Sequence, residues 1–107
     1  MDIAERRVAD VVVVAPVGPI DHPHASELER ALAHVLAPDA IDGAGLVLDF
    51  AGVGYVSSMG LRVLMIAARE LRARRARIAV AELQPVVAEI FDIARFTHAP
   101  RRRRVGA

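Results

Sequence analysis

Short runs of β-branched residues alternate along the chain with segments of helical periodicity, and this alternation constrains the fold most. The clearest run covers residues 11–17, where four consecutive valines lead to Val17. Asp10 and Gly18 bound it, which is typical of a buried strand. Strands that alternate with amphipathic helices predict a single α/β domain. We expect a mixed, mostly parallel sheet of four to five strands, with helices packed against it.

The other elements follow from the same two periodicities. Strands are expected over residues 3–8, 11–17, 46–50 and 77–83, and helices near residue 23, over 58–73 and from residue 85. Two starts are open for the first helix, because Pro23 suits a first turn while Ser26 and Glu29 have capping-box spacing. Pro16 lacks a ladder donor, so the strand over 11–17 should have an edge or bulge near its end.

The apolar stripes of these helices and strands predict the core. The residues whose spacing points them inward are Leu48, Leu61, Leu64, Met65 and Ile90. In the last helix, the buried face is expected at Val87, Ile90, Phe91 and Ala94.

Composition bounds the class of protein. A chain of 107 residues, 54% of them hydrophobic, suits one domain with a proper core. It has no cysteine, which excludes disulfides and Cys-based metal or redox sites. Neither a signal peptide nor an apolar run of membrane-spanning length is present, so we expect a cytoplasmic protein without membrane insertion.

The charge is unevenly distributed. The net charge is +1, and all 14 basic residues are arginine, including Arg101–Arg104 near the end of the chain. We expect the domain to occupy 1–100, with 101–107 as a disordered tail. Without the tail the body is mildly acidic, which argues against a nucleic-acid interface.

Two adjacent serines, Ser57 and Ser58, stand where the loop after the central strand leads into the helix over 58–73. Unpaired N–H groups and the helix dipole at such a position favour negative charge. A phosphate on Ser58 would therefore be tolerated locally while adding a charge of about −1.5 to −2 to the surface. Taken alone, however, these residues are better explained as helix caps.

Other constellations predict no catalytic, cofactor or metal site. Gly52 and Gly54 follow a strand, but Ser57 replaces the third glycine of a dinucleotide loop. Val56 replaces the first glycine of a nucleophile elbow. His22 and His24 are more simply explained as residues of a solvated helix start than as metal ligands.

Residues 46–64 resemble the signature of the anti-sigma factor antagonists, which are STAS domains. That signature is an apolar strand, a short loop and Asp-Ser-X-Gly-Leu, in which the serine after the Asp is phosphorylated. Ser58 falls on this serine, Gly60-Leu61 match the Gly-Leu pair, and Met59 holds the variable position. Ser57 stands where the family has Asp, and is a second candidate acceptor.

Two further stretches agree in order and spacing. Gly18-Pro19-Ile20-Asp21 resembles the family's Gly-polar-apolar-Asp segment after the second strand, with Pro19 in the polar position. Residues 84–93 resemble its last helix, which begins with a proline. The resemblance therefore extends over about residues 8–96.

The resemblance implies a partner-switching regulator that is not an enzyme and needs no cofactor. Its partners would be an anti-sigma serine kinase of the histidine-kinase-like ATPase type and a PP2C-type phosphatase. The partner-binding surface would comprise Asp21, His22, His24, Tyr55, Ser57, Ser58, Met59, Gly60 and Arg62. Two alternatives stay open: a constitutive STAS subunit of an ABC-type lipid transporter, and a small enzyme with Ser58 as nucleophile, for which no base can be placed.

Overall fold

The computed structural model of the chain describes residues 1–37 and 45–94. Within these residues, four strands form one sheet in the order β1-β2-β3-β4. The elements, in chain order, are β1 (Asp2–Val8), β2 (Val11–Val17), α1 (His22–Val35), β3 (Gly45–Asp49), α2 (Ser58–Ala73), β4 (Arg77–Ala81) and α3 (Pro85–Ile93).

The sheet is mixed and mostly parallel, which confirms the expected fold class. β1 and β2 form an antiparallel hairpin, with Val8 opposite Val11. β2 pairs parallel with β3, and β3 with β4, so that Val11, Gly45 and Arg77 lie side by side. Gly45 has a φ of 143°, and a Cβ there would collide with the backbone of Arg77, so this position requires glycine.

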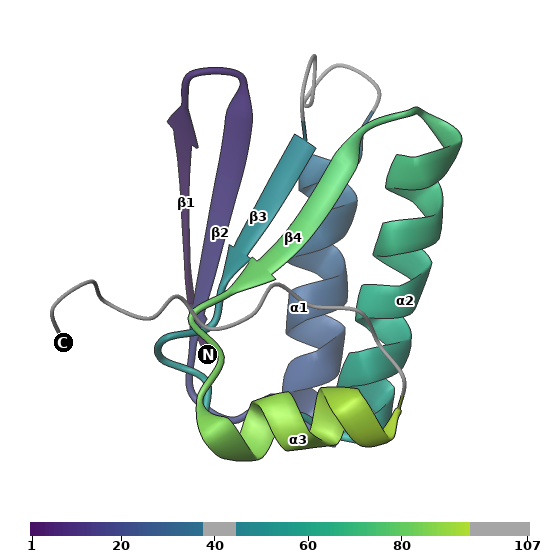
Figure 1. Cartoon of the computed structure of the whole chain (residues 1–107). Helices are drawn as coiled ribbons and strands as arrows, with labels where there is room; N and C mark the ends of the chain where they lie inside the picture. The colour runs from purple at the N-terminus through teal and green to yellow at the C-terminus, as the bar shows by residue number, and fades with distance from the viewer. Residues whose placement is uncertain (38–44, 95–107) are drawn as a thin grey trace, which may run out of the picture.

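The helices lie in two places. α1 and α2 pack side by side on one face of the sheet, whereas α3 lies across the end where β2, β3 and β4 finish (Figure 1). Val87 and Phe91 are the buried residues of α3. The Phe91 ring meets Phe50 edge to face, with centroids 6.1 Å apart, which anchors α3 to the end of β3.

The structure answers two questions that the sequence left open: how Pro16 fits into a strand, and where the first helix starts. β2 pairs with β3 only as far as Val14, so the donor that Pro16 lacks is not needed by that ladder. α1 begins at His22, with Asp21 as its N-cap, which makes Pro23 the second helical residue. The start at Ser26 is therefore wrong.

The core lies between the sheet and the two long helices. Leu48, Leu61 and Leu64 are buried, as predicted, and Ile90 is partly buried. The prediction for Met65 is wrong, because this side chain is 48% exposed. The buried stripe of α2 is centred on Leu64, and the next residue is rotated about 100° toward solvent.

Three other expectations have different outcomes. Ala94, expected on the buried face of the last helix, is exposed where α3 ends. The expected tail at 101–107 lies outside the described residues. Across residues 1–37 and 45–94, no helix is both long and apolar enough to cross a membrane.

The contrast between Leu64 and its neighbour gives a stability test. Leu64→Ala should lower the free energy of unfolding by about 2–5 kcal/mol, because it leaves a cavity between α2 and the sheet. Met65→Ala should change it by less than about 1 kcal/mol, because about half of the side chain is already in solvent. Denaturant titration of both variants measures the difference. Equal losses would show that α2 is rotated from the position described.

Candidate functional site

The loop before α1 and the loop before α2 are joined at the end of the sheet where the parallel strands finish. Ile20 and Val56 form an isolated parallel bridge. The N–H of Ile20 donates to the Tyr55 carbonyl at 2.8 Å, and the N–H of Ser57 donates to the Ile20 carbonyl at 2.8 Å. These bonds place the sequence-predicted segments 21–24 and 55–62 next to each other.

The two serines at the start of α2 do different things. Ser57 is the N-cap, and its Oγ accepts a hydrogen bond from the N–H of Gly60 at 3.1 Å. Ser58 is the first helical residue and its side chain is exposed. Its hydroxyl has no partner within the part of the chain that the structure describes. Capping therefore accounts for Ser57 and leaves Ser58 free.

Gly60 has a role different from the one expected. The sequence predicts it as part of the partner-binding surface, but it is buried. A Cβ at this position would lie 2.7 Å from Cγ2 of Ile20 and 3.0 Å from Cγ1 of Val56. The missing side chain therefore lets α2 approach the joined loops, and Gly60 itself is not open to a partner.

The start of α1 supplies a polar group beside these loops. The carboxylate of Asp21 accepts from the N–H of His24 at 3.2 Å and lies 2.9 Å from that residue's Nδ1. The same Nδ1 is 2.9 Å from the Pro19 carbonyl, and His22 is exposed. Within residues 1–37 and 45–94, no group of three or more potential ligands could hold a metal ion.

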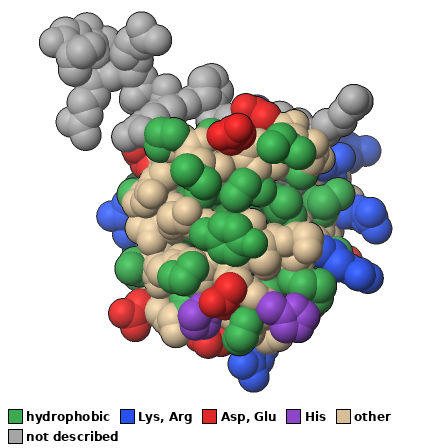
Figure 2. All heavy atoms as spheres, turned by 90° about the horizontal axis from the view of Figure 1, so that it is seen from below, with side chains coloured by type: hydrophobic (Ala, Val, Ile, Leu, Met, Phe, Trp, Pro, Cys, Tyr) green, Lys and Arg blue, Asp and Glu red, His purple; other side chains and the backbone are tan. Residues whose placement is uncertain are grey.

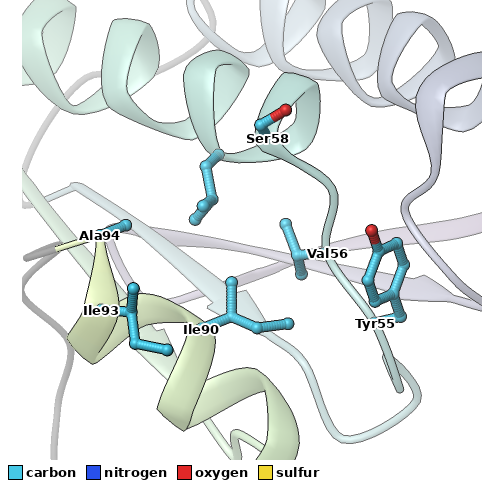
Figure 3. Close-up of a pocket in the computed structure, with 7 residues that line it drawn as sticks. Tyr55, Val56, Ser58, Ile90, Ile93 and Ala94 are labelled. Carbon is cyan, nitrogen blue, oxygen red and sulfur yellow. The ribbon is translucent and has the colours of Figure 1, made fainter.

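An apolar groove opens beside Ser58, between the start of α2 and α3 (Figure 3). Its volume is about 280 Å³, and its lining residues are Tyr55, Val56, Ser58, Leu61, Ile90, Ile93 and Ala94. The sequence prediction included Tyr55 and Ser58 and missed Ile90 and Ile93 of α3 and Ala94, which follows it. Helical spacing had placed Ile90 and Ala94 on the buried face of the last helix, and the 77% exposure of Ile93 is visible only in the structure.

The groove lies on the end of the molecule that α3 crosses. Seen from there, hydrophobic side chains gather in the middle of the face, with histidines near one rim and arginines along one side (Figure 2). Tyr55 and Met59 contribute exposed apolar surface, and Arg62 is exposed on α2. An apolar centre with a polar rim is the usual anatomy of a protein–protein interface.

Comparison with known proteins identifies relatives of this chain. The family model described as STAS domain matches residues 2–103. BtrV of Bordetella bronchiseptica, assigned as an anti-sigma factor antagonist, is 29% identical over 96 residues, which cover 90% of this chain and 80% of BtrV.

Two solved structures share the fold. The Bacillus cell fate determinant SpoIIAA in its phosphorylated form superposes with a TM-score of 0.71 at 18% identity, covering 89% of this chain and 85% of SpoIIAA. A serine-to-glutamate variant of RsbS from Moorella thermoacetica superposes with a TM-score of 0.71 at 19% identity, covering 96% of this chain and 89% of that one.

The two serines are distinguishable by stability alone. Ser57→Ala should destabilise the protein by about 0.5–2 kcal/mol, because the N–H of Gly60 loses its acceptor. Ser58→Ala should change stability by less than about 0.5 kcal/mol, since its hydroxyl caps nothing. Thermal or denaturant unfolding of the two variants provides the comparison. A larger loss from Ser58→Ala would mean that the capping residue has been misassigned.

Proposed function

The chain belongs to the STAS domain family, and from its site geometry we propose that it is an anti-sigma factor antagonist in a partner-switching pathway. Unphosphorylated, it binds a serine kinase of the histidine-kinase-like ATPase type that also serves as the anti-sigma factor. That binding releases the other client of the kinase. Phosphorylation at Ser58 ends the complex, and a PP2C-type phosphatase restores the binding form.

The observation that carries the proposal is the unpartnered hydroxyl of Ser58 at an exposed helix start. Because the neighbouring Ser57 provides the cap, modification of Ser58 removes no bond that holds α2 in place. The first turn of α2 also contains no acidic residue that would repel a phosphate. The fold can therefore survive the modification.

The same position explains why a phosphate would end binding. Ser58 lies next to the exposed side chains of Tyr55 and Met59, which supply apolar surface for a partner. A partner that covers this surface would have to remove water from a group carrying a charge of about −1.5 to −2. Burying an ionised group without a compensating partner is strongly unfavourable.

The roles assigned to the related proteins agree with this proposal. BtrV is assigned as an anti-sigma factor antagonist, and SpoIIAA has been solved in unphosphorylated and phosphorylated forms. Within the described residues, no basic side chain is hydrogen bonded to Ser58, so the serine-nucleophile alternative gains no support. ATP and Mg²⁺ belong to the kinase, and the chain itself needs no cofactor.

Phosphopeptide mapping tests the proposal directly. The purified chain, incubated with its kinase and ATP, should be labelled on Ser58. Ser58→Ala should keep the fold and stay bound in the presence of ATP, whereas Ser58→Asp should keep the fold and bind more weakly. Ser57→Ala, assayed below its unfolding midpoint, is the matched control and should still be labelled.

The alternative outcomes are informative. Label on Ser57 instead would move the acceptor by one residue and contradict the assignment of Ser58. Absence of label despite intact binding would favour the constitutive transporter subunit over a phosphorylation-controlled antagonist.

A further inference from the structure

We propose that the groove beside Ser58 receives one aliphatic side chain of the partner, and that Arg62 pairs with a carboxylate of the same partner segment. This inference rests on the proposed function, because it names the chemistry that the partner must present. It goes further in identifying α3 as half of the recognition site and the groove as the place where phosphorylation acts.

The lining of the groove indicates a side chain as its occupant. The volume of about 280 Å³ lies at the lower end of the 300–1,000 Å³ usual for small-molecule sites, so the chemistry of the lining decides between the two kinds of occupant. Among the described residues, the lining is aliphatic apart from Tyr55 and Ser58, and none of these lining residues is a carboxylate, histidine or arginine that could hold a polar metabolite. Buried aliphatic or aromatic anchors in such pockets commonly dominate the binding energy of an interface.

The rim of the groove is apolar surface that the fold does not use. α3 packs on the core through Val87 and Phe91, which leaves Ile93 77% exposed. On the opposite side, the lining residue Tyr55 is 47% exposed. Exposed apolar side chains that gather around one groove are typical of an interaction site. Docking would bury Ile93 and Tyr55 together.

The charges around the groove indicate which way the partner segment lies. Arg62 is exposed and has no acidic partner within the described residues. It lies four positions after Ser58 on α2, so the two side chains share one face of the helix. On α3, by contrast, the exposed Glu89 precedes the groove residue Ile90. A carboxylate of the partner would therefore be attracted to the α2 side of the groove, near Arg62, and repelled from the α3 side, near Glu89.

Ser58 connects this surface to the switch. Because Ser58 is part of the groove wall, a phosphate on it would stand at the mouth of an apolar pocket, where a docked side chain would strip its water. The phosphate would also be within reach of Arg62, and a charge-assisted pair within the helix would withdraw that cation from the partner. One modification therefore removes both attachments.

Cysteine protection tests the site, because the natural chain has no cysteine. Single-cysteine variants Ile93→Cys and Val8→Cys are alkylated with iodoacetamide, with and without the purified kinase. Val8 is 52% exposed at the far end of the sheet and is the matched control. The kinase should slow alkylation at position 93 about tenfold or more and leave position 8 unchanged. Phosphorylating Ser58 should abolish the protection.

Affinity measurements test the two attachments separately. Ile93→Ser should weaken kinase binding about tenfold, as expected for an anchor site, and Val8→Ser less than about twofold. Arg62→Ala should weaken binding and reduce its dependence on salt. Arg30→Ala, which removes an exposed arginine of α1, should do neither.

Each contrary result has a distinct meaning. If the kinase binds but position 93 is alkylated at its free rate, the groove is not the anchor site while the proposed function stands. Protection that rises with the concentration of the chain alone would identify a second copy as the occupant and overturn the proposal. Wild-type affinity of Arg62→Ala would contradict the acidic contact. Failure of the unmodified chain to bind any such kinase would reject both this proposal and the proposed function.

Discussion

The hydrogen bonds that join the loop before α1 to the loop before α2 are the interaction on which the site depends. Ile20 exchanges backbone hydrogen bonds with Tyr55 and Ser57, and its side chain is fully buried. Gly60 makes this junction possible, because a side chain there would collide with Ile20 and Val56. The junction holds residues from two loops next to each other, and it sets where α2 begins.

Ser57 and Ser58 have different roles because the junction sets where α2 begins. The hydroxyl of Ser57 already accepts the hydrogen bond from the N–H of Gly60, so Ser58 is not needed to cap the helix. A charge added to Ser58 would therefore break no hydrogen bond that caps α2. The serine that replaces the family's Asp provides the cap that a carboxylate would also supply, so capping is retained despite the substitution.

The end of the sheet where the parallel strands finish gathers the remaining parts of the surface. Connections after parallel strands emerge on one edge, so the segments after β2, β3 and β4 meet there. The contact between Phe50 and Phe91 then holds α3 across this edge and creates the groove against α2. The exposed Ser58 and the apolar groove thus lie on one continuous surface, although its residues come from three separate segments.

The sequence by itself determined the elements, the mostly parallel sheet and the position of Ser58 at the start of a helix, because strand and helix periodicities and helix-start chemistry are local properties. Tertiary structure alone decided three matters. The rotation of α2 left about half of the Met65 side chain exposed. Contacts with Ile20 and Val56 required glycine at position 60, and α3 lay beside Ser58. Each depends on packing between residues far apart in the chain, which local spacing does not encode.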